Sequence, residues 1–434
     1  MASSERSDKL CRRLRSNDPN LSVLRSYEIE DYDGTTLVQL VDAARHSQHL
    51  KWMYVDLDYM KMNAWEALAA FVNVSRSIEK LWVWNLRSQI PSRTEYISQF
   101  FSAMNPRAVS LQGFGIEMRE PDRPFMGLER ACVENFFARN DTITIVNILC
   151  EVRDKRKTKR IPAGPTNTHN LGSSFLDCAL AGLQRNDTVQ YLILRHSDQG
   201  EDCRMQINPT CIREFFRYNQ TVETFSYLVG DSAEDAEILG TSLQFNRKSR
   251  EICLHNMSED ASISFFAQLP GACKLDTLTL RDCAFATDVG LNVLAKGVGE
   301  CDCLKRLDLE LIPQDQEGDL LDDLLSRLCP FLVEHPSLRS LKMGNGRRLG
   351  MSGAHAIGDC ISFDAPIKEV DLQVEELTIA GAHALAGKIP FFEKLRTFRL
   401  KCTFMHRESR HILMDALEQN EHLKKWKVDC TKVL

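Results

Sequence analysis

The stretch Leu275-Asp-Thr-Leu-Thr-Leu280 has an apolar residue at its first, fourth and sixth positions. The same spacing returns along the chain, for example in Leu304-Lys-Arg-Leu-Asp-Leu309. Taking the first apolar residue of each phrase as an anchor, we place anchors at positions 21, 50, 78, 106, 143, 189, 222, 249, 275, 304, 338, 367, 395 and 423. Most steps between anchors lie within two residues of 28, so the chain is predicted to be built from repeats.

In the segments between these phrases, apolar residues recur every three or four positions, as they do on one face of a helix. In two of the segments, the apolar residues that share one helix face are Trp65, Leu68, Phe71 and Val72, and Leu321, Leu324, Leu325 and Leu328. Each unit is therefore expected to be a short strand followed by a helix. A single unit cannot bury its apolar face, whereas stacked units share one long core. The sequence predicts an α/β solenoid with parallel strands on a concave face and helices on a convex face.

The repeated phrase resembles the strand signature of leucine-rich repeats, and a step of 28 with helices outside resembles the ribonuclease-inhibitor-like members of that family. The residues that match best are Leu275 to Phe285, where Cys283 occupies the family's Cys or Asn position. Leu86 and Glu151 occupy that position in their own units, so the repeats are degenerate. The resemblance implies a horseshoe of about 14 repeats that binds another protein.

The expected organisation is an N-terminal capping segment at 1–19, with Leu10, Cys11 and Leu14 turned inward, and a solenoid at 20–434. A basic loop is inserted at 150–170, where Arg153-Asp-Lys-Arg-Lys-Thr-Lys-Arg160 precedes Ile-Pro-Ala-Gly-Pro165. Repulsion between its positive charges and its Pro/Gly content predict a protruding loop. An acidic partner, a nuclear import signal and a merely solvated insertion all stay open for this loop.

Composition excludes several classes of protein. The net charge of −6 over 434 residues argues against binding nucleic acid through a strongly basic surface. No signal peptide and no apolar run of about 20 residues is present, so we expect a cytoplasmic or nuclear protein without a membrane span. The 15 cysteines are odd in number and dispersed, which predicts free thiols. Apolar neighbours surround Cys178, Cys253, Cys329 and Cys360, where a free thiol acts as a small hydrophobic side chain. The Asn-x-Thr triplets at 140, 186 and 219 are interpreted as a recurrent helix-to-strand turn.

Aromatic residues lie between the anchors of the first repeats. Because successive side chains of a strand point to opposite faces, the residues between buried anchors should line the concave surface. The aromatic residues placed there are Tyr27, Trp52, Tyr54, Trp82 and Trp84. Mutual packing of these rings is one interpretation, and a binding hot spot made of large rigid side chains is the other.

Charged residues occupy the same face in later repeats. Arg306, Asp308 and Glu310, followed by Glu369 and Asp371, form a mixed to acidic zone. The basic residues that follow on this face are Arg399, Lys401, Lys425 and Lys427. Lysines on the final strand should discourage a second chain from pairing with its edge. Zones of this kind steer encounter with a partner and select its orientation.

The sequence therefore favours a non-catalytic interaction module or scaffold that binds a protein partner on its concave face and carries no cofactor or metal. One alternative is a regulator of a GTPase, like the solenoid that activates Ran, although the long acidic tail of such proteins is absent. Another is an actin-capping protein similar to tropomodulin, because Asn17-Asp-Pro-Asn-Leu21 resembles a phrase in that family. An enzyme is the least favoured reading.

Overall fold

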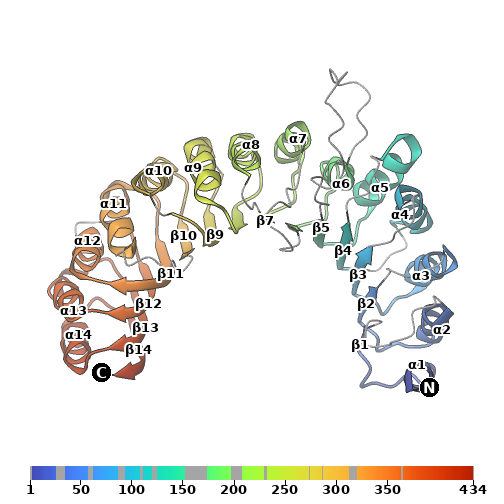
Figure 1. The fold of residues 1–434 in the computed structure, drawn as a ribbon, viewed down its shortest axis with the longest axis horizontal. Coiled ribbons are helices and arrows are strands. Elements are labelled where there is room, and N and C mark those ends of the chain that lie inside the picture. The colour runs from blue at the N-terminus through green and yellow to red at the C-terminus, as the bar shows by residue number, and fades with distance from the viewer. Residues whose placement is uncertain are drawn as a thin grey trace, which may run out of the picture. The chain divides into compact units, whose positions relative to one another are not determined.

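The computed structural model of the chain describes residues 2–25, 35–56, 62–86, 93–107, 111–119, 125–151, 174–196, 208–228, 232–272, 274–285, 287–311, 320–362 and 365–433. Of the basic insertion expected at 150–170, all but the first two residues lie outside these ranges. The chain forms two compact units, Met1–Phe225 and Ser226–Leu434, which we call unit 1 and unit 2. Each unit alternates helices with parallel strands (Figure 1).

The elements of unit 1 are α1 (Ala2–Arg15), β1 (Val23–Arg25), α2 (Thr35–Ala44), β2 (Trp52–Asp56), α3 (Met62–Val74), β3 (Lys80–Leu86), α4 (Arg93–Ala103), β4 (Gly113–Arg119), α5 (Gly127–Arg139), β5 (Ile145–Glu151), α6 (Phe175–Leu183), β6 (Tyr191–His196) and α7 (Pro209–Tyr218). Strands β1 to β6 pair in parallel with their neighbours in chain order. The division between the units falls inside β7 (Thr224–Leu228).

The elements of unit 2 are α8 (Ala233–Leu243), β8 (Glu251–His255), α9 (Glu259–Gln268), the 3-10 turn Leu269–Gly271, β9 (Thr277–Cys283), α10 (Asp288–Gly299), β10 (Arg306–Leu311), α11 (Leu320–Glu334), β11 (Ser340–Leu349), α12 (Met351–Ser362), β12 (Glu369–Leu377), α13 (Ile379–Ala386), the 3-10 turn Ile389–Phe391, β13 (Thr397–Met405), α14 (Arg407–Gln419) and β14 (Lys425–Val433). Strands β8 to β14 also pair in parallel in chain order.

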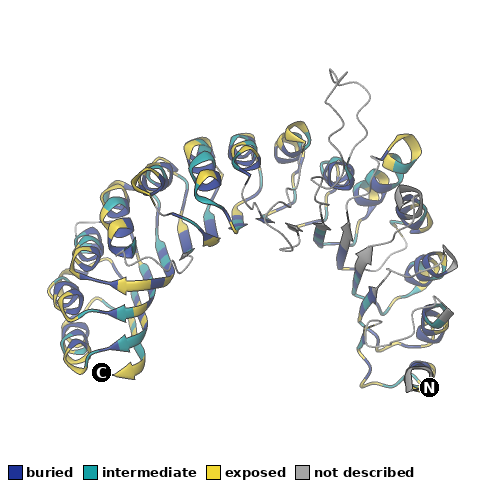
Figure 2. Cartoon of the chain, viewed as in Figure 1, coloured by how far each residue is buried: buried dark blue, intermediate teal, exposed yellow. Residues whose placement is uncertain are grey.

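The anchors of the repeated phrase form the core. Within each unit their side chains point from the strands toward the helices, and Figure 2 shows buried residues along this interior. Leu278 and Leu307 lie side by side on neighbouring strands and are fully buried, as are their phrase partners Leu280 and Leu309. The helical residues predicted to share apolar faces in α3 and α11 are also buried. This alternation of buried strands and helices is the architecture of a leucine-rich repeat solenoid.

One predicted anchor is wrong. In β4, Phe114 pairs with Leu81, so the phrase of this repeat is Leu111-x-x-Phe114-x-Ile116 and begins at 111 instead of 106. The repeats on either side are therefore longer than 28 residues. Phenylalanines fill the wider core here: Phe101 contacts Phe114 and Phe136, with ring centroids 6.0 and 5.0 Å away. Rings of this size supply the volume that the extra chain must enclose.

The helix-to-strand turn depends on a buried asparagine, as the repeated Asn-x-Thr triplets predict. The Oδ1 atom of Asn186 accepts hydrogen bonds from the backbone N–H groups of Thr188 and Val189 at 2.9 and 2.7 Å. Its Nδ2 group donates to the backbone oxygens of Phe137 and Asn140, in the preceding repeat, at 2.7 and 2.9 Å. The side chain thus closes its own turn and attaches it to the neighbouring repeat. Asparagines with the same Oδ1 bonds are Asn140, Asn219, Asn246 and Asn420.

The first helix covers the start of the unit 1 core. α1 spans Ala2–Arg15, inside the capping segment expected at 1–19, and contacts α2. Its inward residues Cys11 and Leu14 are buried, and Leu10 is half-buried. Asn17 follows the helix with a positive φ of 53°, a left-handed conformation that asparagine tolerates better than most residues. The Asn17 side chain then accepts a hydrogen bond from the backbone of Gln48, at 2.7 Å.

We predict that Asn186→Ala lowers the free energy of unfolding by about 3 kcal/mol, because buried backbone groups lose their partners at both ends of the amide. The matched control is Asp187→Ala at the adjacent exposed position, which should change stability by less than about 0.5 kcal/mol. Urea unfolding of both variants provides the comparison. Equal effects would contradict the role of the asparagine.

His335 takes the asparagine's place in its repeat, and its Nδ1 atom accepts from the backbone N–H groups of Ser337 and Leu338 at 3.2 and 3.0 Å. Burial lowers the pKa of His335, against the opposing effect of the Cys301 and Val298 backbones. The unfolded chain therefore takes up this proton more readily than the folded chain. The stability that neutral His335 confers is complete above the unfolded pKa of about 6.5 and declines as the pH falls toward the folded value.

We predict that lowering the pH from 7 to 5 destabilises the wild-type chain more than the His335→Asn variant. Asparagine retains the acceptor and donor atoms of the turn but does not titrate. Urea unfolding at the two pH values measures this difference. The assignment fails if both proteins lose the same stability between pH 7 and 5.

Candidate functional site

The strand face turned away from the helices, which we call the open face, carries the aromatic residues predicted from the first repeats. Trp52 is 39% exposed, while the next residue, Met53, is fully buried. Tyr54 and Trp82 on the same face are half-buried. Tyr27 and the side chain of Trp84 lie outside the described residues, although the backbone of Trp84 pairs with Asp56 between β3 and β2. Trp52, Tyr54 and Trp82 form what we call the aromatic patch.

Trp82 lies across the backbone of the neighbouring strand. A Cβ atom on Gly115 would stand only 2.6 Å from Cε2 of the Trp82 ring, so this position in β4 must lack a side chain for the ring to lie as it does. On its other side the ring contacts Tyr54, with centroids 6.2 Å apart. Register places Tyr54, Trp82 and Gly115 in one row across three strands. The ring is therefore held in one orientation while part of it stays accessible.

Two cations border the aromatic patch. The Lys80 ammonium lies 4.7 Å from the ring centroid of Trp52, and the Arg25 guanidinium lies 5.9 Å from that of Tyr54. Such contacts are worth about 0.5–1 kcal/mol at exposed sites. They hold the long basic side chains against the rings, so that aromatic surface and positive charge are presented together.

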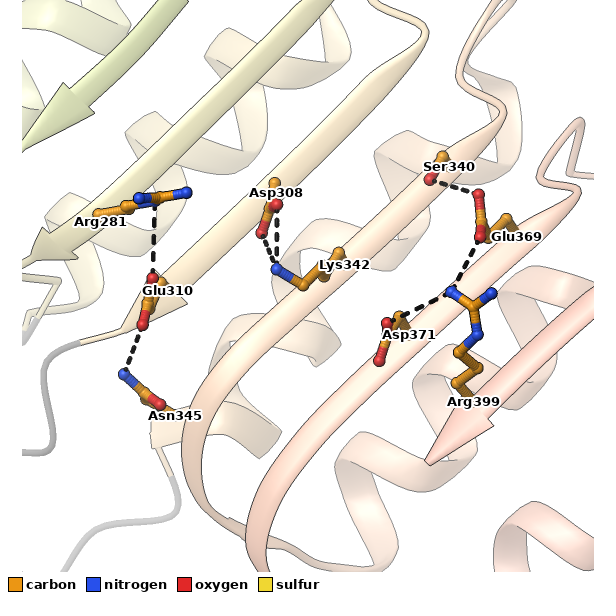
Figure 3. Close-up of polar contacts among 9 residues, drawn as sticks. All are labelled: Arg281, Asp308, Glu310, Ser340, Lys342, Asn345, Glu369, Asp371 and Arg399. Atoms are coloured by element: carbon orange, nitrogen blue, oxygen red, sulfur yellow. Dashed lines mark hydrogen bonds and ion pairs between the residues drawn. The ribbon is translucent and has the colours of Figure 1, made fainter. Parts of the chain in front are cut away.

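The open face of unit 2 carries charged side chains that pair across the strands (Figure 3). Asp308 is nearly buried, and its carboxylate lies 3.2 Å from the ammonium of Lys342 on the next strand. Lys342 lies in turn beside Asp371, and Asp371 beside Arg399, at 3.8 Å in the second pair. One row across β10 to β13 therefore alternates negative and positive charge. Opposite charges in adjacent strands stabilise such a row and fix the side-chain orientations.

The remaining charged residues predicted on this face flank that row. Glu369 lies 3.4 Å from Arg399 and also accepts from the Ser340 hydroxyl at 3.3 Å. Glu310 pairs with Arg281 at 3.8 Å and accepts from the Asn345 amide at 3.2 Å (Figure 3). The exposed residue Arg306 lies beside Ser340 in the strand register. The carboxylates of the mixed to acidic zone expected from the sequence are thus all paired with cations, and the residue missing from that expectation is Lys342.

Asp371 is the least well compensated carboxylate of the row. Burial raises its pKa above the usual aspartate value, while Arg399 and Lys342 act in the opposite direction. Its ion pair with Arg399 is long, and that guanidinium is shared with Glu369. Positive charge from a bound partner would favour the ionised form of this side chain.

Positive charge follows at the last two strands. Arg399 and Lys427 are neighbours in the register of β13 and β14, and Lys401 lies beside Asp429. Lys427 pairs with Asp429 at 2.6 Å. Lys401 and Lys425 are exposed, and neither makes an ion pair with a carboxylate in the described part of the chain. The basic end expected from the sequence thus retains unpaired charge in the structure.

Cys253 lies on the open face instead of in the core, which corrects the expectation from its apolar neighbours. Ile252 and Leu254 are the buried residues of β8, and Cys253 alternates with them. The Nε2 atom of His255 lies 3.2 Å from the Cys253 sulfur and 3.3 Å from the Ser226 hydroxyl. Burial is the main cause that raises the pKa of the Cys253 thiol, so it stays protonated at neutral pH. A nucleophilic cysteine needs the thiolate, which this environment disfavours.

Within the described ranges, no three histidine, cysteine or acidic side chains are grouped as a metal site, and no helix has the length and apolar character needed to cross a membrane. No known protein family and no curated protein matches the chain. A solved structure of leiomodin-1 actin-binding site 2 is similar at 13% sequence identity and a TM-score of 0.25, over 32% of this chain and 78% of that one. The tropomodulin C-terminal domain of Caenorhabditis elegans is similar at 12% identity and a TM-score of 0.26, over 42% of this chain and 92% of that one. At these values, neither likeness assigns a partner to this chain.

We predict that Trp82→Ala costs about 1 kcal/mol of folding stability, because the ring loses contacts with Tyr54 and Gly115 but is not in the core. Leu81→Ala removes a fully buried anchor and should cost about 2–5 kcal/mol. Denaturant unfolding of the two single variants separates the two faces of β3. Similar losses would mean that Trp82 is itself a core residue.

Proposed function

We propose that the chain is a non-catalytic protein-binding module of the ribonuclease-inhibitor-like type, with the aromatic patch at the centre of its interface. The observation that carries this proposal is the placement of Trp52, Tyr54 and Trp82 on the open face, with Trp82 held over Gly115. Large aromatic side chains are the commonest hot-spot residues of protein interfaces. A ring that is already oriented loses little conformational entropy on binding.

The surroundings of the aromatic patch support a protein as its ligand. Lys80 and Arg25 place positive charge at the rings, where they could pair with carboxylates at the rim of an interface. The open face of unit 2, taken by itself, also offers polar contacts to a protein through Arg306, Glu310 and Asp371. The proposal includes a cytoplasmic or nuclear location, in keeping with the free thiols of the described cysteines.

The test begins with a tagged full-length chain used to isolate partners from its native cells, followed by measurement of the affinity of the purified partner. Trp82→Ala should weaken binding by a factor of about 30, which corresponds to a hot-spot truncation of about 2 kcal/mol. Gly115→Ala should weaken it as well, because the added Cβ displaces the Trp82 ring. The matched control is Tyr218→Ala on α7, which removes an exposed aromatic ring outside the aromatic patch.

Unchanged affinity of a folded Trp82→Ala protein would reject the aromatic patch as the interface. Binding of purified actin, or stimulation of GTP hydrolysis by a purified GTPase, would instead favour one of the two alternative functions. Each of these assays uses the chain alone with one defined protein, so it does not depend on the isolation step.

A further inference from the structure

β14 presents an unpaired strand edge in unit 2. It pairs in parallel with β13 along one side, and no described strand pairs with its other side. Alternate backbone N–H and C=O groups of a parallel strand point to opposite sides, so those on the outer side of β14 lack a partner strand. An edge of this kind can accept one more strand.

The apolar side chains of β14 are incompletely covered. Trp426 and Val428 occupy the positions that Phe398 and Leu400 occupy in β13. The β13 residues are buried, whereas Trp426 and Val428 are only half-buried. An added strand with apolar residues on the core side would cover this surface, at a gain of about 25 cal/mol for each Å² removed from water.

The polar side chains of β14 decide which strand could bind. Lys425 and Lys427 lie on the open face of β14. Arg399 and Lys401 lie on the same face of the neighbouring strand β13, and Lys424 is exposed just before β14 begins. Asp429 neutralises Lys427 alone, at 2.6 Å. Residues 424–433 carry four lysines and one aspartate, so a second copy of the chain paired along this edge would set two net-positive strands side by side, which is unfavourable. A strand carrying carboxylates would instead complement them.

We propose that the outer edge of β14 is a docking site for an extended acidic peptide that adds to the sheet as a further strand. Its backbone hydrogen-bonds to β14, its apolar residues cover Trp426 and Val428, and the alternating carboxylates face Lys425 and Lys427. A strand edge selects a peptide over a nucleic acid or a lipid surface, because only a peptide supplies the matching backbone donors and acceptors. This site lies in unit 2 and does not depend on the aromatic patch.

The test uses a fluorescent peptide of alternating glutamate and valine, with binding to the full chain followed by anisotropy. A matched peptide with N-methyl groups on alternate backbone nitrogens retains the charge but loses hydrogen bonds along one edge. We expect the unmodified peptide to bind, to bind more weakly as salt is added, and to slow hydrogen exchange of residues 425–433. The N-methylated peptide should bind at least about tenfold more weakly.

The variant Lys425→Glu/Lys427→Glu should weaken peptide binding at least about tenfold, because it reverses the charge at the edge. The matched control, Arg407→Glu/Arg410→Glu, makes the same charge change at exposed positions of the adjacent helix α14 and should bind as the wild type does. Circular dichroism and thermal unfolding check that both variants are folded. Protection of residues 425–433 by the peptide provides a second readout that is independent of affinity.

The proposal is overturned if the peptide does not bind, if both double variants weaken it equally, or if the N-methylated peptide binds as tightly. Equal binding of single-stranded DNA or of anionic vesicles would show that charge alone is recognised. A dimer of the free chain that the lysine variant dissociates, seen by sedimentation, would make a second copy the occupant.

Discussion

The alternation of side chains along each strand is the constraint on which the remaining structure depends. Met53 and Val55 must face the helices because their burial stabilises the stack, by about 1.5–3 kcal/mol for each large apolar side chain. A slip of one residue in β10 would turn the charged side chains of Arg306 and Asp308 into the core. Burying these unpaired charges would cost more free energy than the strand gains by pairing. Since the anchors alone secure the register, the residues between them are free to serve binding.

The second constraint is the attachment of each repeat to the one before it. Asn186 shows how one amide serves both needs, because its oxygen closes the turn and its nitrogen bonds to the preceding repeat. The repeats tolerate other residues at this position when they supply an acceptor, as Ser47 does for Leu50 and His335 does for Leu338. Histidine adds a sensitivity to pH that asparagine and serine lack.

Much of this architecture follows from the sequence, because the apolar spacing reports the strands and the helical faces directly. The anchor at 106 is wrong because the chain departs from the step of 28 here, and the buried phrase runs from Leu111 to Ile116. Lys342 could have been found, since it occupies the same slot of its repeat as Asp308 and Asp371. The residues at this position of successive repeats are Asp308, Lys342, Asp371 and Arg399, so the alternating charge can be read from the sequence once the repeats are aligned.

Other features of the open face depend on three-dimensional contacts that spacing does not report. The position of the Trp82 ring over Gly115 depends on a side-chain rotamer and on the neighbouring strand. The partial burial of Asp371, and the resulting rise of its pKa, likewise depends on how adjacent strands shield it. The apolar neighbours of Cys253 favour a buried position, whereas the phrase that begins at position 249 places this residue between the buried Ile252 and Leu254.

Oxidative footprinting of the native chain, read by mass spectrometry, tests the assignment of the two strand faces most directly. Trp52 and Met53 are adjacent, and the methionine thioether is readily oxidised when a reagent reaches it. We expect rapid modification of Trp52 and protection of Met53, with Met53 modified only after the chain is unfolded in urea. Modification of Met53 as fast as Trp52 in the native chain would contradict the register, and with it the identity of the open face.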